Sequence, residues 1–335
     1  MVEDKISHLV SLGLKLKDNN NELLNTAKRR AESKNRWFIQ NFIEFAIDSI
    51  VENYLNEEKL RQWLSAYNLE NYNKNETVGL ILAGNIPLVG FHDILCCYVL
   101  DLPVKVKLSS KDEILTKYIL SELQTLDPNW SCEIIERLKG FDKVIATGSN
   151  NTNRYFEYYF KEVPSLLRNN RNSIAVLSGH ETEEELNNFA HDIFMFSGQG
   201  CRNVSKMFLP KDYDVTKLFP HFAAYEFLHM EKLFMDNYDY TRTLLLMNQT
   251  PHLANEFIML KEDAKLQSRL ATVHFSFYEN ETEVANFIAE NEADLQCIVG
   301  MQSKNWKSYS FGKAQKPELW DYADNVDTMS FLLKA

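Results

Sequence analysis

From about residue 77 onward, short apolar runs alternate with amphipathic segments, and this alternation constrains the fold more than any other feature of the sequence. Short apolar runs are typical of buried strands, whereas apolar residues at three- and four-residue steps predict helices. We expect strands at residues 78–83, 104–108, 143–147 and 173–177, and helices at 86–100, 111–126, 152–161 and 181–197. Because strand–helix–strand crossovers are right-handed, this order gives a parallel sheet covered on both faces. The sequence therefore predicts an α/β fold.

The two ends of the chain follow other patterns. Residues 1–75 are polar and helical in period, and one apolar face recurs at Phe38, Phe42, Phe45, Ala46 and Ile50. Beyond residue 210 the pattern is less regular, with strands expected at 272–277 and 296–299 and a helix near 281–290. The change in pattern places a domain boundary near residue 180.

Composition excludes several classes of protein. The net charge of -11 would repel phosphate backbones, so we expect no nucleic-acid partner. No apolar run approaches the roughly 20 residues of a membrane helix, so we expect no membrane span. Five cysteines without a CxxC pair are typical of a reduced compartment, and we expect a cytoplasmic protein. The eight histidines show no metal-ligand spacing such as HExxH, so we expect no metal site.

Cys201 lies in the segment whose residues are best suited to catalysis. Gly198 and Gly200 precede it and permit a tight backbone path, and Arg202 follows it. A guanidinium and a nearby helix end favour the reactive thiolate, and glycines let backbone N–H groups approach a substrate oxygen. The alternative is that Cys201 is a small buried residue in a glycine-containing turn. Composition alone does not decide between the two.

Gly198, Gln199 and Cys201 resemble the Gly-Gln-x-Cys nucleophile motif of the aldehyde dehydrogenase superfamily. The stretch 198–206 is more similar to the acyl-CoA reductase family, which includes the fatty acid reductase subunit of bacterial bioluminescence. Further landmarks occur in the family's order across residues 77–335: Asn85-Ile86-Pro87, Lys107, Thr147-Gly148-Ser149, and the C-terminal runs 311–315 and 322–327.

The resemblance implies an aldehyde dehydrogenase-like architecture. Residues 1–180 would form the N-terminal helices and a Rossmann-like cofactor domain. Residues 181–335 would form an α/β catalytic domain with a C-terminal return and oligomerisation segment, so a homo-oligomer is expected. Cys201 would attack an acyl-CoA or acyl-carrier thioester and become acylated, and the product would be an aldehyde. An acyl-transferring partner protein would also be compatible with this chemistry.

The resemblance also assigns roles to individual residues. The Asn85 amide and the Cys201 N–H would stabilise the oxyanion. Thr147, Gly148 and Ser149 would meet the nicotinamide end of the cofactor, and Lys107 would lie beside its adenosine end. Asn85 would otherwise be an ordinary turn residue ahead of Ile86-Pro87.

Two departures from the superfamily bear on the reaction. Hydrolytic members carry a glutamate that activates water, and its place falls at residues 167–170, where no carboxylate occurs. This absence favours reduction of a thioester over formation of an acid. After Lys107 the chain reads Leu108-Ser109-Ser110-Lys111, where many NAD-preferring members have a glutamate. Two hydroxyls and a lysine suit a 2′-phosphate, which predicts NADPH. The serines would equally cap the helix that follows.

Three alternatives remain open at this stage. An acyl-phosphate reductase of the glutamyl phosphate reductase type would need a cluster of cationic residues, and the chain shows only Arg202 and Lys206 near the cysteine. A non-catalytic acyl-binding subunit would share the fold without the chemistry. The aromatic residues 155–160 line either an acyl channel or a packed helix face.

Overall fold

The computed structural model describes residues 2–70, 72–148 and 150–334. It divides the chain into two compact units. The first unit comprises Met1–Asn170 together with Pro317–Ala335, and the second comprises Arg171–Lys316. The sequence pattern places the division near residue 180; the strand that begins at Asn172 belongs to the second unit, and the last residues return to the first.

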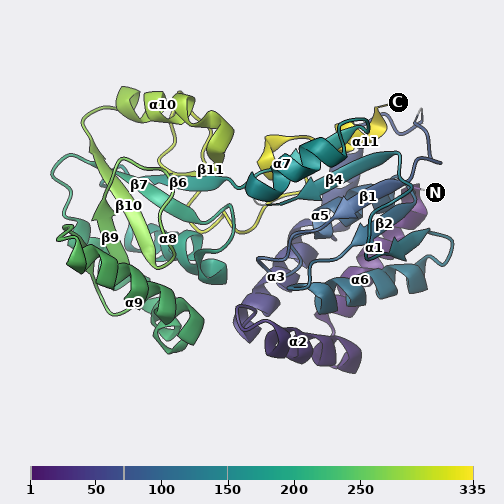
Figure 1. Ribbon diagram of the computed structural model, residues 1–335, viewed down its shortest axis with the longest axis horizontal. Helices are drawn as coiled ribbons and strands as arrows, with labels where there is room; N and C mark the ends of the chain where they lie inside the picture. Colours follow the sequence, from purple (N-terminus) through teal and green to yellow (C-terminus); the bar gives the residue numbers. More distant parts are fainter. Residues whose placement is uncertain (1, 71, 149, 335) are drawn as a thin grey trace. The chain divides into compact units, whose positions relative to one another are not determined.

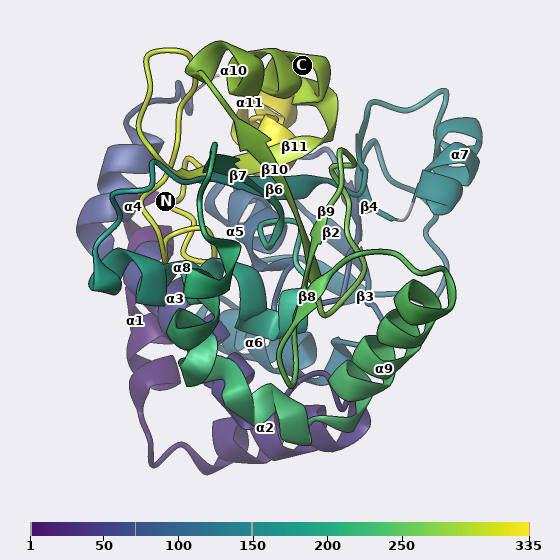
Figure 2. The same cartoon turned by 90° about the vertical axis from the view of Figure 1, so that its left-hand side faces the viewer.

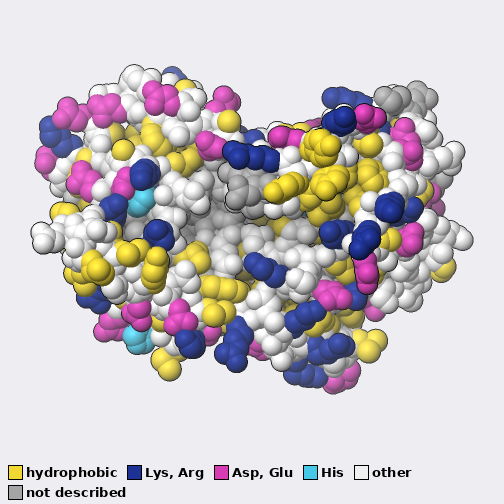
Figure 3. All heavy atoms as spheres, in the orientation of Figure 1, with side chains coloured by type: hydrophobic (Ala, Val, Ile, Leu, Met, Phe, Trp, Pro, Cys, Tyr) yellow, Lys and Arg dark blue, Asp and Glu magenta, His cyan; other side chains and the backbone are white. Residues whose placement is uncertain are grey.

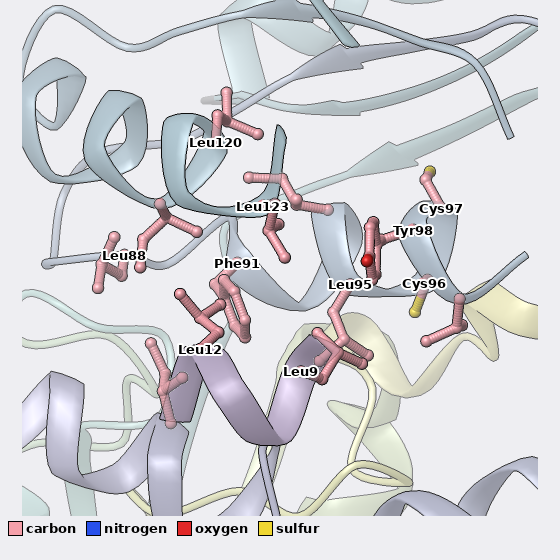
Figure 4. Packing of buried hydrophobic residues seen from close by; sticks show 14 of the residues in the cluster. Leu9, Leu12, Leu88, Phe91, Leu95, Cys96, Cys97, Tyr98, Leu120 and Leu123 are labelled. Carbon is pink, nitrogen blue, oxygen red and sulfur yellow. The ribbon is translucent and has the colours of Figure 1, made fainter. Parts of the chain in front are cut away.

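Four helices open the first unit: α1 Val2–Lys17, α2 Glu22–Lys34, α3 Gln40–Asn53 and α4 Glu57–Leu64. Asn21 and Asn56 cap α2 and α4, because each side-chain oxygen accepts a backbone N–H of the first turn. Leu9 and Leu12 of α1 pack beside Phe91 and Leu95 of α5 (Phe91–Val99), as Figure 4 shows. Helices and sheet of this unit therefore share one apolar core.

The first sheet has the strand order β3-β2-β1-β4-β5, and every neighbouring pair is parallel. Its strands are β1 Val78–Ile81, β2 Val104–Lys107, β3 Cys132–Ile134, β4 Lys143–Thr147 and β5 Ser165–Arg168. Helices α5, α6 (Glu113–Leu126) and α7 (Asn150–Tyr159) connect them, as Figure 1 shows. The predicted α/β fold is confirmed. The helix expected at 86–100 starts only at Phe91, because Leu88 has a left-handed φ of 56° and interrupts the helical path.

The C-terminal segment is tied to the first unit by a buried ion pair. Arg168, at the end of β5, donates from Nη1 to Asp93 of α5 at 2.5 Å and from Nη2 to the hydroxyl of Thr328 at 2.8 Å. Thr328 begins α11 (Thr328–Leu333). Asp324 accepts the N–H of Asn169 at 3.1 Å. These contacts make residues 317–335 a structural part of the first unit.

The second unit contains a sheet of order β11-β6-β7-β10-β9-β8, with only β8 antiparallel among the described strands. The strands are β6 Asn172–Val176, β7 Val204–Pro210, β8 Leu253–Ala254, β9 Met259–Glu262, β10 Thr272–Tyr278 and β11 Leu295–Gly300. Helix α10 (Glu281–Glu290) lies on one face and α8 (Glu183–Phe194) on the other, as Figures 1 and 2 show. Thr182 and Glu185 form a capping box at the start of α8. The chain also contains α9 (Lys232–Met247) and short 3-10 segments at Met195–Gly198, Val215–Met230, Glu292–Asp294 and Ala323–Asn325.

Helix α7 presents aromatic side chains in two ways. Phe156 and Phe160 pack against the first sheet, whereas Tyr155, Tyr158 and Tyr159 are 67%, 73% and 72% exposed. Figure 3 shows hydrophobic side chains at the surface over this helix. The expected packed face therefore holds for the phenylalanines and is wrong for the tyrosines.

Within the described residues, no helix is both long enough and apolar enough to cross a membrane.

Candidate active site

The catalytic residue and the cofactor residues that the sequence predicts in the first unit lie at one edge of its sheet. Asn85 follows β1, Lys107 ends β2, and Thr147 ends β4. Strand β1 lies between β2 and β4, and all three run in the same direction. Ligands of open parallel sheets bind outside the carboxyl ends of strands at such a change of strand order. Ser149 lies outside the described residues.

The turn that carries Asn85 lies against the segment that follows β2. A Cβ on Gly84 would stand 2.4 Å from the Ser109 hydroxyl oxygen, so only glycine permits this approach. The Ser109 hydroxyl accepts the N–H of Lys111 at 3.3 Å, but this does not cap the helix, which begins at Glu113 with Asp112 as its N-cap residue. Lys107 and Ser110 are exposed. The expected capping of this helix by Ser109 and Ser110 is therefore wrong, and the side chains of Lys107 and Ser110 lie at the surface.

Asp112 joins these two turns, and the sequence reasoning missed it. Its Oδ2 accepts the N–H of Leu88 at 2.8 Å and the hydroxyl of Thr116 at 3.3 Å. Its Oδ1 is buried without a hydrogen-bond partner among the described residues. Burial raises the pKa of Asp112 to about 8, against the effect of these hydrogen bonds. A buried carboxylate beside the Asn85 turn therefore sets the position of that turn.

The place predicted for a hydrolytic glutamate holds a buried cation instead. Strand β5 ends at Arg168, which is 5% exposed and paired with Asp93. The pairing raises the pKa of Arg168 even though burial opposes it. Residues 167–170 contain no carboxylate. This stretch has no side chain that could act as a general base for water.

Cys201 belongs to the second unit and lies directly before β7. Phe196, Ser197 and Gly198 all have left-handed backbone, with φ of 55°, 55° and 75°. We call residues 195–203 the cysteine turn. Asn203 holds it closed: its Oδ1 accepts the N–H of Gly200 at 2.7 Å, and its Nδ2 donates to carbonyls of residues 192, 193 and 195. Consecutive strained residues held by one buried side chain are typical of functional sites.

Three side chains define the surroundings of the Cys201 thiol. Its Sγ lies 4.0 Å from Oε1 of the buried Gln296. Ser173 donates its hydroxyl to the Cys201 carbonyl at 2.9 Å. The buried guanidinium of Arg202 lies 5.8 Å from the centre of the Tyr309 ring. Cys201 is a partly exposed residue and does not belong to the buried core.

Cys297 provides a contrast within the same unit. It is fully enclosed, and desolvation raises the pKa of its thiol to about 11 although Arg202 acts in the opposite direction. Cys96 and Cys97 are also buried, and Cys132 is the other partly exposed cysteine. Because the thiolate is the nucleophile, the buried thiols are unreactive.

The C-terminal run 311–315 is anchored to the helix before the cysteine turn. Asp192 of α8 accepts the N–H of Gly312 at 2.7 Å and that of Ala314 at 3.0 Å. Burial raises the pKa of Asp192 to about 7. The family landmark at 311–315 therefore supports α8 rather than supplying a reactive side chain of its own.

Among the described residues, no three His, Cys, Asp or Glu side chains gather closely enough to hold a metal ion.

Comparison with known proteins bears on the fold. No protein-family model matches the chain, and no curated protein does. Aldehyde dehydrogenase 21 of Physcomitrella patens, solved in complex with the reaction product succinate, has a TM-score of 0.66 at 11% identity, covering 91% of this chain and 74% of that one. The Mycobacterium tuberculosis aldehyde dehydrogenase complexed with NAD+ has a TM-score of 0.64 at 10% identity, covering 92% and 79%. The NAD+ complex of the Bacillus cereus aldehyde dehydrogenase has a TM-score of 0.65 at 14% identity, covering 91% and 72%.

The fold and the similar structures define the class of architecture. It is an α/β protein with a Rossmann-like parallel unit and a second α/β unit that carries the cysteine turn. More particularly, it has the fold of the aldehyde dehydrogenases.

Proposed function

We propose that the protein reduces an acyl thioester, carried by CoA or an acyl carrier, to an aldehyde with NADPH through an acyl-Cys201 intermediate. The observation that carries the proposal is Cys201 itself. It is partly exposed, and it stands on a strained turn that Asn203 and Ser173 hold in place. Such a turn orients a nucleophile before any substrate arrives, which lowers the entropic part of the barrier.

Deprotonated Cys201 attacks the thioester carbonyl carbon. The Sγ–C bond forms, and the carbonyl becomes an oxyanion that needs hydrogen-bond donors. We assign these donors to the Cys201 N–H and the Asn85 amide, following the resemblance noted in the sequence. The oxyanion then collapses, and the carrier leaves as a thiol after taking up a proton. The acyl group remains on Cys201.

The carboxyl edge of the first sheet fits a dinucleotide. Gly84 lets the turn after β1 approach the Ser109 side chain closely, and Lys107 and Ser110 are exposed. We assign Lys107, Ser109 and Ser110 to the adenosine end, where a cation and hydroxyls suit a 2′-phosphate. We assign Thr147, Gly148 and Ser149 to the nicotinamide end. When bound, NADPH would supply a hydride to the acyl carbon, and cleavage of the Sγ–C bond would release the aldehyde and return the Cys201 thiolate. The NAD+ complexes among the similar structures support a nicotinamide cofactor.

Arg168 supports reduction over hydrolysis. The stretch 167–170 offers no carboxylate to activate water, and Arg168 is engaged by Asp93 and Thr328. An acyl-cysteine that meets no water-activating base survives until hydride arrives. The rival acyl-phosphate reductase would need further cations near Cys201. Lys206, the nearest lysine in sequence, is fully buried, and its ammonium donates to the backbone carbonyl of Asp263 and to the hydroxyl of Ser276.

The test uses the two partly exposed cysteines as a matched pair. Incubation with a medium- or long-chain acyl-CoA, without NADPH, is expected to add one acyl mass to the Cys201 peptide and none to the Cys132 peptide. Cys201→Ala should abolish NADPH oxidation, whereas Cys132→Ala should retain it. Unchanged oxidation in Cys201→Ala would refute the mechanism. Equal turnover with NADH and NADPH would refute the cofactor assignment. Acylation by an acyl phosphate but by no thioester would favour the rival.

We also propose a homo-oligomer. Three tyrosines of α7 are more than two-thirds exposed, and clustered exposed aromatic residues are typical of interfaces. Tyr158→Glu is expected to lower the mass measured by light scattering, and Tyr240→Glu, at an exposed tyrosine of α9 in the second unit, is not. An unchanged mass for Tyr158→Glu would exclude α7 as the contact.

A further inference from the structure

Strand β11 departs from regular pairing near the cysteine turn. Its partners in β6 are Asn172 for Leu295 and then Ile174 for Ile298, so three steps along β11 match two along β6. A second irregularity occurs between β6 and β7, where Ser173 pairs with Val204 and Ile174 pairs with Lys206. A bulge adds a residue to one strand and re-aims its side chains, and bulges are over-represented next to active sites. Both irregularities flank Ser173.

The bulged start of β11 contacts Cys201 at two points. Gln296 places Oε1 4.0 Å from the Cys201 Sγ. The next residue, Cys297, donates its N–H to the Ser173 hydroxyl at 3.2 Å, and that hydroxyl donates to the Cys201 carbonyl at 2.9 Å. Gln296 makes its contact through its side chain and Cys297 through its backbone N–H, so two consecutive residues of the bulged stretch hold the same cysteine.

The chemistry of the Gln296 contact is specific to one form of the thiol. In this structure the amide oxygen of Gln296 faces the sulfur, where it accepts a hydrogen bond from S–H; a thiolate would need the amide turned so that Nε2 donates instead. Gln296 is 3% exposed, so water competes poorly for its oxygen. Charged and titratable groups nearby act on the neighbouring Cys297: burial raises its pKa, the Arg202 guanidinium lowers it, and Asp192 and Cys201 raise it. Gln296, by contrast, contacts the Cys201 sulfur itself.

We propose that Gln296 is a positioning residue that keeps the Cys201 thiol protonated and oriented until the sulfur engages its substrate. Ser173 fixes the backbone end of the same cysteine. This inference rests on the proposed role of Cys201 as nucleophile, but it does not depend on the identity of the substrate or cofactor. It identifies the start of β11, which shows no motif in the sequence, as part of the active site.

The experiment measures the pH dependence of alkylation of Cys201 by iodoacetamide. A Cys132→Ser background leaves Cys201 as the only partly exposed cysteine. Gln296→Met removes the acceptor at similar volume, and Gln296→Asn withdraws it by one methylene. Each is expected to move the midpoint to lower pH by roughly half to one unit, the effect of losing one neutral hydrogen bond to the thiol. Gln302→Met, an exposed glutamine of the same unit, is the control and should not move it.

The same variants separate the inference from the proposed function. Under the proposed function, Gln296→Met should change kcat for thioester reduction and leave the KM for NADPH unchanged. A shifted alkylation midpoint in a protein that no acyl-CoA acylates would keep the positioning role and refute the substrate class. An unshifted midpoint in both Gln296 variants, with Cys201 still alkylated, would overturn the inference.

Discussion

Replacement of Asp112 by Asn tests how the buried carboxylate beside the Asn85 turn affects stability. The asparagine keeps an oxygen for the N–H of Leu88, which lies 2.8 Å from the present carboxylate. It removes the charge that burial penalises. The variant therefore separates the hydrogen bond from the ionisation, whereas Asp112→Ala removes both.

The sign and size follow from the raised pKa of Asp112, which burial moves from an ordinary 3.8 to about 8. The folded protein holds this proton more tightly than the unfolded chain, so the wild type loses stability as pH rises from about 4 to about 8. At about 1.4 kcal/mol per pKa unit, a shift of about four units sets an upper bound of about 6 kcal/mol. Because relaxation around buried charges reduces such penalties, we expect about 2–3 kcal/mol.

The measurement is thermal and urea unfolding of both proteins at pH 5, 7 and 8.5, followed by tryptophan fluorescence. Four of the five tryptophans, Trp37, Trp63, Trp130 and Trp320, lie in the first unit with Asp112, so the signal reports mainly that unit. At pH 5 the two proteins should unfold within about 2 °C of each other. At pH 8.5 Asp112→Asn should unfold roughly 4–10 °C higher. A difference that is the same at both pH values, or lower stability of the variant throughout, would refute the reasoning.

Three further variants test other parts of the structure. Arg168→Met leaves Asp93 buried and unpaired, and it should lower the unfolding free energy by about 3–5 kcal/mol in urea titrations; a loss under 1 kcal/mol would contradict the role of this ion pair. Gly84→Ala places a Cβ 2.4 Å from the Ser109 hydroxyl oxygen, and it should raise the KM for NADPH at least about fivefold with little change in kcat; an unchanged KM would argue against the cofactor site. Asn203→Ala removes four hydrogen bonds of the cysteine turn, so it should slow alkylation of Cys201 and lower the unfolding free energy by about 2–4 kcal/mol. Unaltered alkylation would show that the turn keeps its conformation without Asn203.

Local sequence patterns predicted the three central strands of the first sheet and missed its edge strands β3 and β5. The strands at residues 78, 104 and 143 begin where they were expected, because each is a short apolar run between polar turns. The pattern missed β5, a four-residue edge strand that contains Arg168, because a buried cation breaks the apolar run. It also missed β7, which contains Lys206, for the same reason.

The candidate site was predictable only where it depends on local motifs. Asn85, Lys107 and Thr147 follow or end predicted strands, so their common edge follows from the parallel sheet. Gln296, Ser173 and Asp112 carry no motif. Their roles depend on strand order, on bulges and on contacts between residues far apart in sequence, which local periodicity does not encode.

The return of residues 317–335 to the first unit has a consequence for biosynthesis. The second unit is continuous in sequence, so all of its strands have been synthesised before the ribosome reaches residue 317. The first unit, although it begins earlier, cannot bring Arg168 against Thr328 until the last stretch has been made. The later-encoded half can thus mature first, and a nascent chain arrested before residue 317 would expose an unfinished apolar surface to chaperones.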